Sequence, residues 1–99
     1  MSKLYKEILV CYDIQDNKKR KKLYEALKDI GLNSIQKSVF WGHANEAEKK
    51  AVRREISRYL DHRTDKAFVV DVNLRDKIQT QGFGYGPEDL EPLRRYETI

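Results

Sequence analysis

A short apolar run that ends on a carboxylate constrains this chain more than any other feature. The residues from Ile8 to Tyr12 are all apolar or aromatic, and Asp13 follows them directly. A run of this length bounded by charge is typical of a central strand covered on both faces. Such a strand places Asp13 on a rigid element at the rim of the sheet, where a side chain can hold a metal ion or orient a water molecule. The alternative is a turn before the next helix, since Asp and Asn also cap helices.

The segment after this strand predicts a helix from Asn17 to Ile30. Asp16 or Asn17 can cap its start, and Gly31 stands where a glycine commonly ends a helix. One face is apolar, because hydrophobic residues recur at steps of four and three residues: Leu23, Leu27 and Ile30.

The first turns of this helix carry a cluster of cations, which we call the basic cluster: Lys18, Lys19, Arg20, Lys21 and Lys22. Cations at this end of a helix oppose its dipole, so the cluster favours a role in binding phosphate groups. Residues 1–42 hold nine Lys and Arg against five Asp and Glu, whereas residues 43–99 hold eleven of each. This asymmetry predicts a polyanion partner on one face, and a solvated helix face is the alternative.

The middle of the chain predicts one or two strands, a second helix and a further strand. The alternation from Asn33 to Trp41 is imperfect, so we expect a strand with a bulge, or two short strands meeting near Lys37 and Ser38, and Gly42 as its end. A helix is expected from Asn45 to Leu60, with Asn45 and Glu48 forming a capping box. Its cations are balanced by glutamates, which indicates a salt-bridged solvent face: Lys49, Lys50, Arg53, Arg54 and Arg58. A further buried strand is expected from Ala67 to Val72.

The C-terminal part is harder to assign. Leu74 to Ile78 is expected to form a helical turn, and alternating glycines and aromatics follow at residues 82–86. A short helix from Glu88 to Tyr96, interrupted by Pro92, and a closing strand from Arg94 to Ile99 both remain open. The order of elements predicts one α+β domain over residues 1–99. Its fold would be a ferredoxin-like sandwich, βαββαβ, with a C-terminal extension over about residues 73–99.

Several other classes of protein are disfavoured. No apolar run approaches the roughly 18 residues of a membrane span, and the N-terminus lacks the apolar region of a signal peptide, so we expect a cytoplasmic protein. The single cysteine, Cys11, cannot form an internal disulfide. His43 and His62 are far apart and have no zinc-ligand spacing, so we interpret both as polar surface residues.

The order and spacing of several motifs resemble the Cas-two family, the small second core protein of CRISPR adaptation. The motifs cover about residues 4–72: Tyr12-Asp13-Ile14, Asp16 with Arg20, Lys22 and Leu23, the segment from Leu27 to Leu32, and the segment from Gln36 to Gly42. The chain departs from the family at Ser34, often basic, at Lys37, often aromatic, and at Lys22, often Arg. These departures bear on nuclease activity more than on the fold.

The resemblance implies a ferredoxin-like homodimer in which two copies of Asp13 face each other near the two-fold axis and share a divalent metal, Mg²⁺ or Mn²⁺. It implies that the C-terminal segment packs on or crosses to the partner protomer. It also implies that the dimer bridges copies of a CRISPR integrase subunit and holds duplex DNA on its basic face. Some relatives cleave RNA or DNA with metal, so Asp13 would be the catalytic residue and metal ligand.

Three functions follow as hypotheses. The first is a DNA-binding subunit of a spacer-acquisition integrase, with the basic cluster as the nucleic-acid-binding surface and endonuclease activity left open. The second is a stand-alone metal-dependent endoribonuclease, a toxin of the VapD type, in which Arg20 or Lys22 steadies the developing charge. The third is a small-molecule regulatory domain on the same fold, which the basic cluster disfavours.

Overall fold

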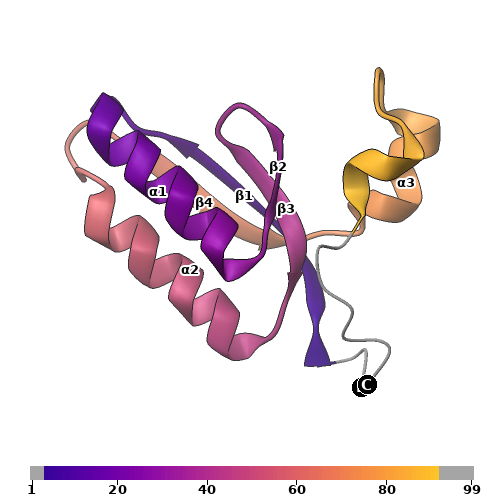
Figure 1. Ribbon diagram of the computed structural model, residues 1–99, viewed down its shortest axis with the longest axis horizontal. Coiled ribbons are helices and arrows are strands. Elements are labelled where there is room, and N and C mark those ends of the chain that lie inside the picture. Colours follow the sequence, from indigo (N-terminus) through magenta and orange to yellow (C-terminus); the bar gives the residue numbers. More distant parts are fainter. Residues whose placement is uncertain (1–3, 92–99) are drawn as a thin grey trace.

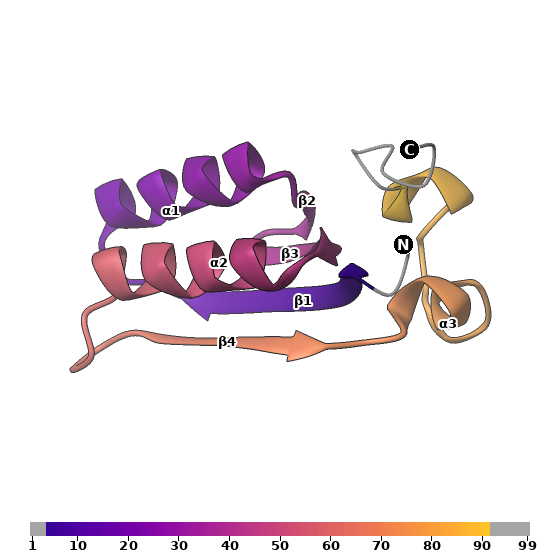
Figure 2. The same ribbon diagram turned by 90° about the horizontal axis from the view of Figure 1, so that it is seen from below.

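A four-stranded antiparallel sheet with two helices on one face makes up most of the protein, whose computed structural model describes residues 4–91 (Figures 1 and 2). The sheet order is β2-β3-β1-β4. In chain order the elements are β1 (Lys6–Asp13), α1 (Asn17–Ile30), β2 (Asn33–Gln36), β3 (Val39–Ala44), α2 (Glu46–Tyr59), β4 (Lys66–Asp71), α3 (Leu74–Gln81) and the 3-10 helix η2 (Pro87–Leu90). This is the predicted ferredoxin-like α+β sandwich. No helix within residues 4–91 is long and apolar enough to cross a membrane.

The central strand β1 is covered on one face only. Ile8, Val10 and Tyr12 are buried beneath α1 and α2 (Figure 2). Leu9 and Cys11 alternate with them on the opposite face and are only half-buried. Within residues 4–91 no second layer covers this part of the sheet, so the expectation of a strand covered on both faces is wrong for the described part of a single protomer.

Local capping signals define α1 as expected. The Asp16 side chain accepts a hydrogen bond from the backbone N–H of Lys19 at 3.0 Å. Gly31 ends the helix in the left-handed conformation, with φ of 113°, which glycine adopts at little cost. Both boundaries of the predicted helix are confirmed.

The irregular alternation after α1 corresponds to two short strands joined by a turn at Lys37 and Ser38, one of the two predicted arrangements. Gly42 does not end the second strand, since β3 continues to Ala44. The glycine instead permits close packing: a Cβ at this position would lie 2.7 Å from Cδ2 of Leu32.

The second helix, α2, begins at the predicted capping box. The Asn45 side chain accepts a hydrogen bond from the Glu48 N–H at 2.8 Å, and the Glu48 side chain accepts one from the Asn45 N–H at 2.9 Å. Lys49 does not join the solvent face that the sequence predicted. Its side chain is buried, and its ammonium lies 3.0 Å from the Asp71 carboxylate on β4.

The helix α3 is longer than the predicted turn and lies beyond one end of the sheet (Figure 2). Oε2 of Glu7, on β1, accepts hydrogen bonds from the backbone N–H of Leu74 at 2.6 Å and of Arg75 at 2.8 Å. The same oxygen accepts one from Nε1 of the buried Trp41 at 2.7 Å. Glu7 therefore caps α3 and fixes Trp41 at once. The proposed closing strand, most of the proposed helix over residues 88–96 and the end of the crossing tail lie outside the described residues.

Candidate nucleic-acid and metal site

Asp13 lies exposed at the end of β1, as the sequence predicted. In the sheet register it is paired with Lys66 on β4. Nε2 of Gln15 donates a long hydrogen bond of 3.4 Å to Oδ1 of Asp13. A shallow hollow of about 180 Å³ adjoins the carboxylate. It is lined by Cys11, Tyr12, Asp13, Lys66, Ala67 and Phe68.

Asp13 is not part of a metal-ligand cluster within one protomer. Residues 4–91 contain no group of three or more His, Cys, Asp and Glu side chains that could hold a metal ion. Magnesium takes several oxygen ligands and usually retains waters, so one exposed carboxylate is an incomplete site. The side chains fit a divalent cation only if a second copy of Asp13 is brought close.

The basic cluster divides into two kinds of residue. Lys18, Lys19, Lys21 and Lys22 are exposed, and none of the ion pairs found within residues 4–91 involves them. Arg20 is half-buried: its Nη1 donates to the Ile14 carbonyl at 2.7 Å, and its Nη2 donates to the Asn17 side chain. Four lysines are thus available to phosphate groups, while Arg20 also supports the backbone.

A second hollow connects this cluster to the turn between β2 and β3. It has a volume of about 250 Å³ and is lined by Tyr12, Asn17, Arg20, Lys21, Tyr24, Lys37 and Ser38. Burial raises the pKa of Tyr12, so its hydroxyl is protonated and can donate a hydrogen bond at neutral pH. Sequence reasoning missed Lys37 as a member of this basic surface. It located the turn but had no signal that the turn folds back against α1.

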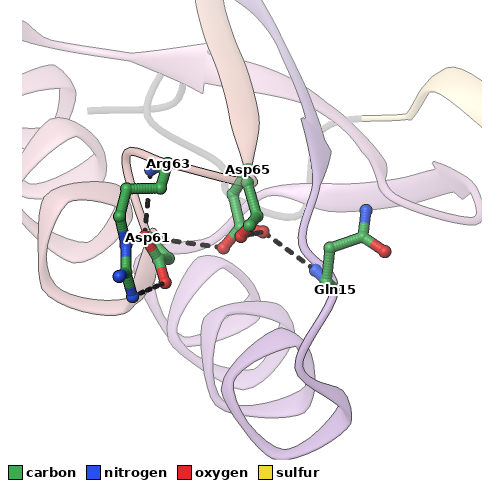
Figure 3. A network of polar contacts seen from close by, with 5 residues as sticks. Gln15, Asp61, Arg63 and Asp65 are labelled. Atoms are coloured by element: carbon green, nitrogen blue, oxygen red, sulfur yellow. Dashed lines mark hydrogen bonds and ion pairs between the residues drawn. The ribbon is translucent and has the colours of Figure 1, made fainter.

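A network of acidic side chains stabilises the loop between α2 and β4 (Figure 3). The Arg63 guanidinium lies 3.2 Å from the Asp61 carboxylate and lowers the pKa of Asp61 to about 2. Asp65 is buried, and its carboxylate accepts hydrogen bonds from the backbone N–H groups of Asp61 and Gln15, which lower its pKa. Both carboxylates are therefore ionised at neutral pH.

The two histidines are absent from the Asp13 site. His62 is exposed in the loop before β4. His43 lies half-buried on β3 with its ring edge against Trp41, at a centroid distance of 5.3 Å. Cys11 is half-buried beside the Asp13 hollow, where burial raises its pKa. Its thiol is therefore a poor nucleophile at neutral pH.

Comparison with known proteins gives consistent results. The family model for CRISPR associated protein Cas2 matches residues 6–79. The chain is 38% identical over 96 residues to CRISPR-associated endoribonuclease Cas2 1 of Francisella tularensis subsp. novicida, which covers 97% of this chain and 98% of that protein. It is 35% identical over 86 residues to CRISPR-associated endoribonuclease Cas2 of Korarchaeum cryptofilum, covering 82% and 92%.

Two solved structures are also similar. Cas2 of Streptococcus pyogenes superposes with a TM-score of 0.65 at 23% identity, covering 77% of this chain and 99% of that one. A hypothetical protein of Thermus thermophilus superposes with a TM-score of 0.63 at 34% identity, covering 69% and 82%. The first likeness concerns the fold alone, and the second adds sequence similarity over 69% of this chain.

Proposed function

The chain belongs to the CRISPR-associated Cas2 family, and we propose that it is a dimeric nucleic-acid-binding subunit of CRISPR adaptation. In this proposal it holds duplex DNA on its basic face beside an integrase subunit. The observation that carries the proposal is the set of four exposed lysines in the first turns of α1, the helix that follows Asp13 in the chain. Lysine contacts to phosphates position a duplex without reading its sequence, so we expect little sequence preference.

The uncovered face of the sheet supports the homodimer. Phe68 and Val70 on β4 are 54% and 41% exposed. The register pairs them with Cys11 and Leu9 on β1, and directly opposed residues project from the same face of a sheet. The four side chains thus form one apolar patch, which we call the open face. We propose that two copies of the open face pack together.

The position of Asp13 gives this dimer a specific consequence. Asp13 follows the half-buried residues of β1 on the same face of the strand, and a two-fold axis duplicates every residue near the interface. Two carboxylates brought close repel each other, and Mg²⁺ or Mn²⁺ would relieve that repulsion. The crossing of the C-terminal tail to the partner sheet remains a prediction.

Metal-dependent cleavage of RNA or DNA is the second candidate function. It is favoured by the exposed Asp13 and by relatives named endoribonucleases. The paired Asp13 carboxylates would hold the cation, and Lys22 or the remaining donors of Arg20 would steady charge developing on the phosphate. When bound, a divalent cation supplies an activated water for attack on the phosphodiester.

The test is Asp13→Ala in the full chain, compared with Asp29→Ala, which removes an exposed carboxylate near the other end of α1. Duplex binding is measured by fluorescence anisotropy, cleavage of RNA and DNA in Mg²⁺ or Mn²⁺ by gel, and integration with the co-purified integrase subunit. We expect Asp13→Ala to abolish cleavage and to leave binding and integration intact. The Asp29→Ala variant should retain all three.

Two outcomes contradict these proposals. If folded Asp13→Ala loses integration as completely as cleavage, the DNA-binding role is wrong and an enzymatic role replaces it. If the variant cleaves as well as the wild type, Asp13 is structural. Thermal melting accompanies the three assays, because these outcomes are decisive only for a folded variant.

A further inference from the structure

The peptide group that joins Ile14 to Gln15 is held at both ends by side chains from other parts of the chain. Its carbonyl accepts a hydrogen bond from Nη1 of Arg20, on α1, at 2.7 Å. Its N–H donates to Oδ1 of Asp65, in the segment between α2 and β4, at 3.0 Å. A peptide group is planar, so fixing its oxygen and its nitrogen fixes its orientation. This peptide group begins one residue after Asp13.

We call the two hydrogen bonds on this peptide group, from Arg20 and to Asp65, the clamp. The surroundings of Asp65 hold its carboxylate in place for this contact. Asp65 is only 7% exposed. Its Oδ2 accepts from the Asp61 N–H at 2.9 Å, and its Oδ1 also accepts from the Thr64 hydroxyl at 3.0 Å. Figure 3 shows its carboxylate between the loop and the Gln15 nitrogen. The loop therefore presents a rigid carboxylate to the end of β1.

Asp65 also makes a contact outside the loop that it stabilises. The bond to Gln15 spans 50 positions of sequence and joins the loop to the β1–α1 junction. The Gln15 side chain in turn donates to Oδ1 of Asp13 at 3.4 Å. A continuous path thus runs from the Asp65 carboxylate through the backbone and side chain of Gln15 to Asp13.

We propose that Asp65 is a positioning residue for Asp13, acting with Arg20 through the Ile14–Gln15 peptide group. The inference rests on the proposed role of Asp13 as a metal ligand. Such a ligand works only when its position is held to within about 0.5 Å and its orientation to within about 10–20°. Loss of the groups that orient a metal ligand typically lowers metal affinity or activity about 10–100-fold.

The test uses Asp65→Ala in the full chain, with Thr64→Val as the matched control. The control removes one hydrogen bond to the same carboxylate but leaves the bond to Gln15. Mn²⁺ affinity is measured by electron paramagnetic resonance, and hydrogen exchange of the Gln15 amide by NMR. We expect Asp65→Ala to weaken Mn²⁺ binding about 10–100-fold and to accelerate exchange at Gln15, while Thr64→Val resembles the wild type.

If Asp65→Ala does not fold, Asp65→Asn retains the size and one acceptor oxygen and is expected to weaken Mn²⁺ binding in the same direction. Wild-type Mn²⁺ affinity in folded Asp65→Ala would overturn the proposal. So would an equal loss in Thr64→Val, because that effect would come from the loop.

Failure of the proposed function gives a different result. Asp13→Ala would then bind Mn²⁺ as the wild type does. The clamp would still be decided by the carboxyl ¹³C resonance of Asp13. That resonance should shift in Asp65→Ala and not in Thr64→Val if Asp65 positions Asp13, and an unshifted resonance in Asp65→Ala would reject the clamp.

Discussion

Replacing Lys18, Lys19 and Lys21 together with Ala is expected to weaken duplex binding without destabilising the protein. The three side chains are exposed. The Asp16 cap survives, because it accepts from the backbone N–H of Lys19, which Ala retains. Cations in the first turns oppose the helix dipole and Ala is the strongest helix former, so the melting temperature should stay the same or rise.

The size of the binding effect follows from counterion release. Each phosphate contact contributes about 0.9 to the slope of log affinity against log salt for B-form DNA. Losing three contacts should therefore reduce the slope by about 2.7. When salt rises fourfold, from about 50 to 200 mM, the fold-loss of duplex affinity should be about 40 times larger for the wild type than for the variant.

The matched control replaces Lys50, Arg53 and Arg54 with Ala, which removes the same charge from exposed positions on α2. Fluorescence anisotropy of a labelled duplex at several salt concentrations gives both slopes. If only net charge mattered, the two triple variants would behave alike. An unchanged slope in the α1 variant, together with a reduced slope in the α2 variant, would refute the assignment of the DNA surface to α1.

Three further changes test the fold and the dimer. Phe68→Asp places a charge on the open face and should give the monomer mass, near 11.7 kDa, by light scattering. The control Ala47→Asp, on α2, should leave the dimer intact. A dimeric Phe68→Asp would exclude the open face as the interface. Glu7→Ala removes the acceptor that holds α3 and Trp41, so the fluorescence of this only tryptophan should shift to the red, and an unshifted spectrum would show that other contacts suffice. The pKa of Asp61 falls from 3.8 to about 2 on folding, so the contribution of Asp61 to stability is present above about pH 4 and is lost as pH falls toward 2. Asp61→Asn should flatten this part of an acid-denaturation curve. An unchanged curve would contradict the ion pair with Arg63.

Both boundaries of α1 and the start of α2 were predictable because their signals are local. A side-chain cap acts within three residues, as Asp16 does on Lys19 and Asn45 does on Glu48. A glycine in the left-handed conformation ends a helix wherever the chain continues, as Gly31 does. The same residues would be read correctly in many folds, since none of these contacts requires a distant part of the sequence.

Other contacts were not predictable, because each joins residues far apart in the chain. Asp65 meets Gln15 across 50 positions, and Glu7 meets Leu74 across 67. The helical position of Lys49 predicts an exposed side chain, yet the side chain is buried and forms an ion pair with Asp71 on β4. Composition and periodicity indicate which face of an element is apolar, but not which polar side chain of a neighbouring element lies against it.

The proposed homodimer would account for the apolar run in β1, which the protomer alone does not explain. An antiparallel sheet with one solvated face normally alternates apolar and polar residues, yet Leu9 and Cys11 interrupt that alternation on the uncovered side. Fully burying a side chain the size of Val or Phe stabilises a protein by about 1.5–3 kcal/mol, so Phe68 and Val70 leave a substantial gain unrealised in one copy. In the proposed homodimer, a second open face would supply the missing layer and would bring two Asp13 residues toward one axis. In the proposed dimer, the contact that covers this face of β1 would also bring together the two Asp13 carboxylates of the proposed metal site.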